Sequence, residues 1–220
     1  MIMETIKKLQ NEAVQFLTKS KIVLKGIDIL PKEIEVYYYE VNGSFKDGSV
    51  HKNKKQMNNK NHFYVHRKGT EESNLYIGGT RGCLDFVVSD NENVFYSYLI
   101  RSAVINGEIV VGPNNVLRKI LEVSNLEKSD LENTLLELKS YDNPNDILFS
   151  KRIGLGKKAN NYIDCPLRAV VCDEFYSRYK GKEKIMIEFL SNSIKLQEIT
   201  KAQAFKYAKE KLGYELSIFK

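Results

Sequence analysis

The stretch that decides the fold is Glu33-Ile34-Glu35-Val36-Tyr37-Tyr38-Tyr39-Glu40-Val41. Successive side chains of a β-strand point to opposite faces of the sheet, so every second residue shares a face. On that rule Ile34, Val36, Tyr38 and Glu40 lie on one side of the strand. The residues ahead of Glu40 on its face are apolar, and we therefore predict a strand whose last carboxylate points the way the core does.

Further runs with the composition and alternation of strands lie on both sides of this stretch. They cover residues 21–29, 63–66, 75–77, 83–89 and 94–105. Asp90-Asn91 and Asn106-Gly107 place turn-forming residues between neighbouring runs, which is typical of hairpins. The first half of the chain therefore predicts antiparallel strands that are joined by one long basic loop.

Helical patterns flank the predicted strands. Apolar residues recur at helical spacing over residues 5–20, and Pro113 suits the first turn of a second helix. Ser129 and Glu132 have the spacing of a capping box, which predicts a helix that continues to about residue 138.

The C-terminal part is also helical in pattern, with Thr200 suited to begin a helix and Gly213 suited to end one. We predict an α+β fold with a single domain, built on a curved, open-barrel-like antiparallel sheet flanked by helices. Residues 1–172 form this domain, and residues 173–220 form a helical extension packed on it.

The bulk composition is that of a globular protein. Of 220 residues, 42% are hydrophobic and 28% are charged, which suits one sizeable core. Residues 1–8 lack the apolar region of a signal peptide, and no apolar run approaches the length that spans a bilayer. We expect no membrane partner and a cytoplasmic or nucleoid-associated location.

Cysteine and histidine give no strong sign of a disulfide framework or a metal site. Cys83, Cys165 and Cys172 form no CxxC pair, and their odd number argues for reduced thiols. His62 and His66 are spaced to share a metal, but no other Cys or His stands beside them in the sequence. We expect no metal.

The charge of the chain favours an acidic partner, because the net charge is +6 and the pI about 9.0. Residues 46–68 contain seven Lys and Arg residues and one acidic residue. Such a stretch can neutralise nucleic-acid phosphates, and the candidate DNA contacts are Lys52, Lys54, Lys55 and Lys60. A solvated loop that keeps the protein soluble is the alternative, and charge by itself favours that alternative.

A series of motifs follows in order along the chain. Glu40 stands eleven residues before His51 (51 − 40 = 11), and Gly69-Thr70 begins eighteen residues after that histidine (69 − 51 = 18). The series continues with Gly79, Cys83, Asp85, Leu99-Ile100-Arg101-Ser102-Ala103, Gly112-Pro113, Arg152-Ile153-Gly154 and Pro166-Leu167-Arg168. In order and spacing it resembles, from about residue 13 to residue 171, the alkyladenine (methylpurine or 3-methyladenine) DNA glycosylase family, which excises damaged purines in base excision repair.

The resemblance implies roles for four residues at a reaction centre. Glu40 falls on the catalytic glutamate, which activates the water that attacks the sugar C1′. Arg101 falls on the arginine that holds this glutamate and the water. His51 falls on a histidine that packs against the extruded base, and Asp85 falls where the family usually has an asparagine that discriminates against normal purines.

Three further positions depart from the family pattern. Asn42 falls on a tyrosine that stacks on the flipped base, and Gly78 falls on the tyrosine that wedges into the duplex. Leu75, or by a shift of one residue Asn74, replaces another stacking tyrosine. Base–aromatic stacking contributes roughly 1–3 kcal/mol per contact. These departures therefore concern recognition of the nucleotide more than cleavage of the bond.

N-glycosidic cleavage needs a carboxylate that stabilises the oxocarbenium-like state and activates water. A buried arginine needs an anionic partner, and we expect Arg101 to pair with Glu40. No lysine stands beside Glu40 in the motif, which predicts simple hydrolysis without a Schiff base. Taken one by one, Glu40 and Asp85 also fit ordinary strand carboxylates, and a turn or bulge is the favoured interpretation of Gly78-Gly79.

We therefore expect a monofunctional purine-DNA glycosylase-like hydrolase. It would be a monomer that acts on damaged double-stranded DNA without a metal or organic cofactor. Two alternatives stay open: a catalytically weak DNA-binding relative with the same fold, and an N-glycosidase that acts on a nucleoside or on RNA.

Overall fold

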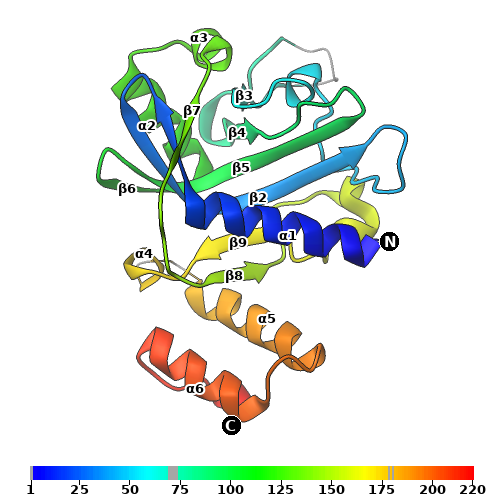
Figure 1. Ribbon diagram of the computed structural model, residues 1–220, viewed down its shortest axis with the longest axis vertical. Coiled ribbons are helices and arrows are strands. Elements are labelled where there is room, and N and C mark those ends of the chain that lie inside the picture. Colours follow the sequence, from blue (N-terminus) through cyan, green and yellow to red (C-terminus); the bar gives the residue numbers. More distant parts are fainter. Residues whose placement is uncertain (1, 69–73, 178, 180) are drawn as a thin grey trace.

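The computed structural model of the chain describes residues 2–68, 74–177, 179 and 181–220. Its described strands are β1 (Ser20–Leu24), β2 (Ile27–Glu40), β3 (Phe63–Val65), β4 (Leu84–Val87), β5 (Val94–Ile105), β6 (Glu108–Val111), β7 (Glu137–Ser140), β8 (Ile147–Ser150) and β9 (Arg168–Val171). Hydrogen-bonded neighbours run in the order β3-β4-β5-β2-β1-β7, with β6 beside β5, and β9 between β2 and β8. The result is a curled antiparallel half-barrel flanked by helices (Figure 1), which confirms the predicted α+β fold class.

The two longest strands, β2 and β5, form the centre of the sheet. Their register is interrupted twice, because Lys32 and Arg101 are each an extra residue between two paired positions. Such β-bulges turn neighbouring side chains toward the same side and bend the strand. In β5, Arg101 and Ser102 both reach the side chain of Glu33.

One face of the sheet is covered by α1 (Ile2–Lys19), which lies across the strands in Figure 1. The helix buries an apolar stripe, which includes Leu9 and Phe16, against Ile34, Val36 and Tyr38 of β2. We call this side the helix-covered face. Residues three and four apart lie on one side of an α-helix. The buried residues of α1 have this spacing, which is the pattern from which the helix was predicted.

The opposite side carries Glu35, Tyr37, Asp85 and Ser97, and we call it the loop-covered face. The register places Tyr37 of β2 opposite Ser97 of β5. Leu99 of β5 lies between Glu35 of β2 on one side and Asp85 of β4 on the other. Loop residues, among them Leu155, pack over this face. Polar side chains on a covered face have to be hydrogen-bonded, because an unpaired buried polar group is costly.

The remaining helices complete the body of the protein. They are α2 (Pro113–Ser124), α3 (Lys128–Asn133), α4 (Glu174–Ser177), α5 (Lys182–Lys195) and α6 (Lys201–Leu212), with the short 3-10 helices η1 (Lys54–Gln56), η2 (Gly79–Arg81), η3 (Lys157–Tyr162) and η4 (Ser217–Phe219). In Figure 1, α5 and α6 lie beyond β8 at one end of the molecule. Their apolar core reaches the sheet at Leu148 and Val170. Thr200 caps α6 and Gly213 ends it in the left-handed conformation, as predicted.

Several predicted elements differ from the observed ones. The strand predicted over 21–29 is divided by a turn at Lys25 and Gly26, where both φ angles are positive. Residues 75–77 form only an isolated bridge, from Tyr76 to Arg67.

The helix predicted to run to about residue 138 ends at Asn133, and residues 137–140 form β7 instead. It begins at Lys128 without a capping box, because the Glu132 carboxylate is bound by Arg67 instead of by the helix N-terminus. The Gly69-Thr70 motif lies outside the described residues.

Candidate active site

A buried carboxylate, Asp85 of β4, is the centre of a polar cluster on the loop-covered face. Its Oδ1 lies 2.6 Å from Nε2 of His66, and its Oδ2 accepts hydrogen bonds from Gln56 at 2.9 Å and Ser97 at 2.8 Å. Burial is the largest single effect and would raise the pKa of Asp85, but His66, His51 and the hydroxyl of Ser97 together hold the pKa below its ordinary value. Asp85 is therefore an ionised carboxylate with both oxygens occupied.

His51 lies on the outer side of this cluster. Its ring centroid is 4.3 Å from that of His66, and its Nδ1 is 3.3 Å from the hydroxyl of Tyr64. Burial and the neighbouring His66 lower the pKa of His51 to about 4. At neutral pH the imidazole is uncharged, so it presents an aromatic surface to its surroundings. The predicted grouping of His51 with Asp85 is thus observed, with His66 between them.

A second buried carboxylate, Glu35 of β2, lies on the same face. It accepts a hydrogen bond of 3.0 Å from the hydroxyl of Tyr37 and one of 2.7 Å from the backbone N–H of Ile153. Nη1 of Arg101 lies 3.2 Å from its Oε1. Burial raises the pKa of Glu35 above its ordinary value, although Arg101 acts in the opposite direction.

The predicted ion pair between Arg101 and Glu40 is wrong. Arg101 pairs with Glu33, at 3.0 Å from Nε to Oε1, and with Glu35. Glu40 lies opposite Val94 in β5, seven residues from Arg101 (101 − 94 = 7), a separation of roughly 23 Å along the strand. The two side chains also belong to opposite faces of the sheet.

Glu40 is bound by its own turn. Its Oε2 accepts a hydrogen bond of 3.1 Å from the N–H of Phe45, and its Oε1 accepts one of 3.0 Å from the hydroxyl of Tyr38. The backbone donor of Phe45 is the main cause that lowers the pKa of Glu40. Asn42, in the same turn, is exposed and donates to Asn93. The prediction that Glu40 shares a strand face with the core residues Ile34, Val36 and Tyr38 is correct, and both of its carboxylate oxygens accept hydrogen bonds there.

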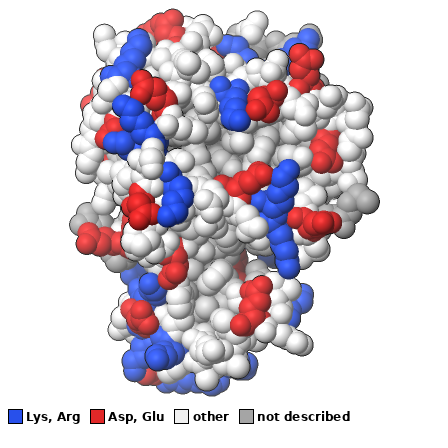
Figure 2. Space-filling view, in the orientation of Figure 1, with Lys and Arg blue, Asp and Glu red and all other residues white. Residues whose placement is uncertain are grey.

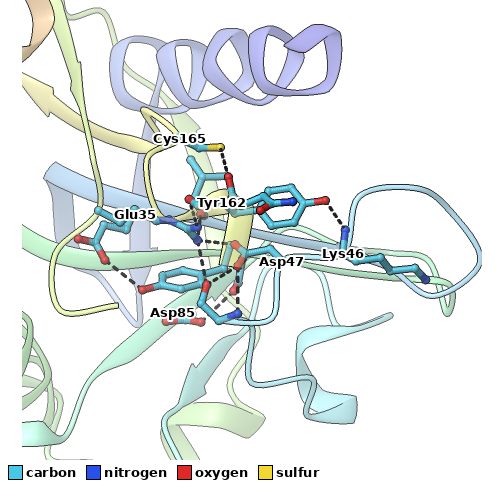
Figure 3. A network of polar contacts seen from close by, with 12 residues as sticks. Glu35, Lys46, Asp47, Asp85, Tyr162 and Cys165 are labelled. Atoms are coloured by element: carbon cyan, nitrogen blue, oxygen red, sulfur yellow. Dashed lines mark hydrogen bonds and ion pairs between the residues drawn. The ribbon is translucent and has the colours of Figure 1, made fainter. Parts of the chain in front are cut away.

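Arg152 fixes the loop that covers Glu35. Its Nη1 lies 2.6 Å from Oδ2 of Asp47 and donates to the carbonyl of Val36 at 3.1 Å. Its guanidinium also stacks over the ring of Tyr37, 4.9 Å from the centroid. Figure 3 shows how this network joins Glu35, Asp47 and Tyr162, which come from three separate segments of the chain.

The basic residues that were predicted to contact DNA are engaged with the protein itself. Lys55 pairs with Glu132 at 3.2 Å and Lys60 pairs with Asp90 at 3.1 Å. Lys52 lies over the ring of Tyr39, 5.1 Å from its centroid, while Lys54 is exposed in η1. On the face shown in Figure 2, basic and acidic side chains are intermixed. Part of the positive charge over residues 46–68 is therefore compensated by acidic side chains of the protein itself.

Leu75 and Gly78 lie at the surface. Leu75 is 70% exposed, and Gly78 precedes η2 with open space around its α-carbon. His62 and His66 do not share a site, since His66 is bound to Asp85 and His62 lies against the carbonyl of Lys60.

Two wider properties follow from the described part of the chain. In residues 2–68, 74–177, 179 and 181–220, no three His, Cys, Asp or Glu side chains are grouped as ligands of a metal ion. None of the helices described is both long and apolar enough to cross a membrane.

Comparison with known proteins adds no assignment. No family model matches the sequence, and no curated protein matches it significantly.

Sequence reasoning missed Glu35 and Tyr37 on the loop-covered face, and it missed His66 in the Asp85 cluster. A signal for the first two was present, because the alternation that places Glu40 with the core places Glu35 and Tyr37 together on the other face. His66 carried no such signal, since its contact with Asp85 depends on the pairing of β3 with β4.

Proposed function

We propose that this protein is a monofunctional N-glycosylase that hydrolyses the N-glycosidic bond of a damaged purine in DNA, with Glu35 as its general base. The observation that carries the proposal is the pairing of Glu35 with Arg101 on the face that also holds His51 and Asp85. These are the residue types that the sequence resemblance asks for at one centre.

The spacing of an aromatic residue supports Glu35 over Glu40 as the base. The resemblance implies a stacking tyrosine two residues after the catalytic glutamate. Tyr37 stands two residues after Glu35, whereas Asn42 stands two residues after Glu40. In addition, Glu40 has a lowered pKa and is bound by its own turn, while burial raises the pKa of Glu35.

The chemistry assigned to Glu35 is that of a base and of a counter-charge. Its ionised form would take a proton from the attacking water and stabilise the oxocarbenium-like sugar. A general base works best when its pKa lies near the operating pH, and burial moves the pKa of Glu35 upward in that direction while Arg101 acts against it. Glu35 is 0% exposed, so the loop that includes Ile153 and Gly154 has to move before a sugar reaches it.

The neighbouring aromatic cluster would receive the base. His51, Tyr64 and His66 lie within 6.0 Å of one another between ring centroids. A neutral His51 suits stacking on a purine, because it brings no charge into the pocket. Asp85 already accepts from three side chains, and we assign it the role of holding His66 rather than of reading the base edge.

Binding of DNA rests on the overall charge more than on a single patch. The net charge is +6, and Lys52 and Lys54 follow His51 closely in the chain, in the segment that contains η1. Because Lys55 and Lys60 are ion-paired, we expect modest affinity with a shallow dependence on salt. We propose that the protein acts as a monomer.

The deciding experiment compares two glutamine variants. Duplexes that carry hypoxanthine, ethenoadenine or a methylated purine are incubated with the protein and scored for alkali-labile abasic sites. We expect Glu35→Gln to lower the single-turnover rate by about 100- to 10,000-fold, the usual contribution of a general base. Glu40→Gln is the matched control and should keep most of the activity. A large loss of rate in Glu40→Gln with little loss in Glu35→Gln would assign the catalytic role to Glu40. If the wild-type protein forms no abasic sites, the proposal is refuted.

A second candidate is an N-glycosidase that acts on a free nucleoside. It is favoured by Leu75 and Gly78, which lie at the surface and provide no aromatic side chain to fill the space that a flipped base leaves in a duplex. Hydrolysis of purine nucleosides by the wild type, lost in Glu35→Gln and accompanied by no binding of duplex DNA, would select this candidate.

A further inference from the structure

We propose that Tyr179, in the C-terminal extension, is a positioning residue that holds Arg101 against Glu35. This inference rests on the proposed role of Glu35. It brings one side chain of the extension to the reaction centre, although the sequence resemblance ends near residue 171.

The contact runs through Glu33. The hydroxyl of Tyr179 donates to Oε2 of Glu33, and the same hydroxyl accepts a hydrogen bond of 3.0 Å from Nη2 of Arg168. Burial, and next the charge of Glu33, raise the pKa of Tyr179 to about 12. The hydroxyl is therefore protonated at neutral pH, as a donor to a carboxylate must be.

Glu33 passes this constraint on to the candidate catalytic pair. It is 1% exposed, and its Oε1 receives Nε of Arg101 at 3.0 Å and Nε of Arg168 at 2.7 Å. Its Oε2 accepts from Ser102 at 2.8 Å in addition to Tyr179. Arg101 then reaches Glu35 with the other end of its guanidinium. The hydroxyl of Tyr179 is thus connected to the proposed base through two side chains, Glu33 and Arg101.

The two β-bulges explain why the extension meets the sheet at this point. Arg101 is the extra residue in β5, which lets it share the side of the sheet with Ser102 and reach Glu33. Lys32 is the extra residue in β2, and it forms a nearly buried ion pair of 2.6 Å with Asp173, at the start of the extension. Both irregularities therefore join the centre to the extension, at Asp173 and at Tyr179, and bulges of this kind are common beside active sites.

Removal of the Tyr179 hydroxyl leaves the ring contacts in place. The ring centroid lies 5.6 Å from that of Phe175 and 5.7 Å from Cζ of Arg168, and phenylalanine preserves both contacts. Glu33 would then have one donor fewer, and Arg101 would turn further toward it and away from Glu35. The carboxylate of Glu35 would lose both orientation and part of its compensating charge.

The test is the variant Tyr179→Phe, with Tyr207→Phe as the matched control. Tyr207 lies in the same extension and donates its hydroxyl to Asp146 at 2.9 Å, remote from Glu33 in its contacts. We expect Tyr179→Phe to lower kcat by roughly 10- to 100-fold with KM unchanged, as for other small displacements of catalytic groups. The acid limb of the kcat–pH profile should move to higher pH, because Glu35 loses part of the charge that keeps it ionised. Tyr207→Phe should match the wild type in both.

Two further results separate the possible failures. Tyr179→His restores an N–H donor to Glu33 and should recover part of the lost rate; a rate no higher than that of Tyr179→Phe contradicts positioning by a donor. An active wild type with an unaltered Tyr179→Phe profile overturns this inference alone. An inactive wild type overturns the proposed function together with it.

Discussion

The guanidinium of Arg101 lies 3.2 Å from Oε1 of Glu35, on the face of the sheet opposite α1. The contact matters because Glu35 is fully buried and keeps a raised pKa in spite of it. Burial and a charged partner thus act on the pKa of this carboxylate in opposite directions, which is a recurrent property of catalytic groups.

The first prediction concerns the pH dependence of the proposed reaction. Catalysis needs ionised Glu35, and burial raises its pKa above the ordinary value of 4.5, so the rate should fall as pH is lowered through a midpoint above that value. Arg101→Lys keeps a positive charge but loses the guanidinium group, whose separate nitrogens contact both Glu33 and Glu35. Its acid limb should therefore lie at higher pH than that of the wild type. Single-turnover rates between pH 4 and 9 measure this, and an unshifted limb would remove Arg101 from the proposed mechanism.

The second prediction concerns His51 and stability. Its pKa is lowered from 6.5 to about 4 in the folded protein. The unfolded chain therefore binds more protons between these values, and folding loses stability as pH falls from about 6.5 toward 4. The loss from this one group should be on the order of 1–3 kcal/mol.

His51→Gln should flatten this part of the stability profile, measured by urea unfolding at a series of pH values. His62→Gln is the control, because His62 lies against the Lys60 carbonyl and outside the Asp85 cluster. Equal slopes for His51→Gln and the wild type would contradict the burial of a neutral His51.

The third prediction concerns the buried Glu132, which holds α3 against β3. Its carboxylate accepts from Arg67 at 2.7 Å, from the N–H of Val65 at 2.8 Å and from the hydroxyl of Tyr76 at 2.9 Å. Glu132→Gln leaves the buried Arg67 without its counter-charge and should lower the free energy of unfolding by about 3–5 kcal/mol. Lys60→Ala breaks an exposed ion pair and should cost less than about 1 kcal/mol. Urea unfolding followed by circular dichroism compares the two, and similar losses would show that the Glu132 pair is not the stronger one.

The fourth prediction concerns the turn that binds Glu40. A β-carbon on Gly43 would lie 1.9 Å from Oε2 of Glu40, so an alanine there forces the carboxylate out of its hydrogen bonds. Gly43→Ala should destabilise the protein by about 1–3 kcal/mol. Gly78→Ala, at a position with nothing within 4 Å and a φ of −98°, should change stability by less than about 0.5 kcal/mol. Thermal unfolding distinguishes the two, and a silent Gly43→Ala would mean that the Glu40 turn is not fixed.

Prediction from the sequence was most accurate where the signal is local. The helix over 5–20, the strand over 94–105, the helix start at Pro113 and the cap at Thr200 all have counterparts in the structure. Each depends on periodicity or on a cap within a few residues. The capping box predicted for Ser129 and Glu132 was wrong because it, too, was inferred from local spacing only. The distant Arg67 offers the Glu132 carboxylate a stronger partner.

The sequence by itself determined which residues share a face of β2, because side chains alternate along a strand whatever surrounds them. It therefore separated Glu40 from Glu35 and Tyr37 before any fold was known. Only the tertiary structure decided which face holds the polar centre. The bulge at Arg101, the pairing of β3 with β4 and the loop of Ile153 bring partners to Glu35 and Asp85 from distant parts of the chain. Contacts of that kind are decided by strand register and loop packing, which no local pattern encodes.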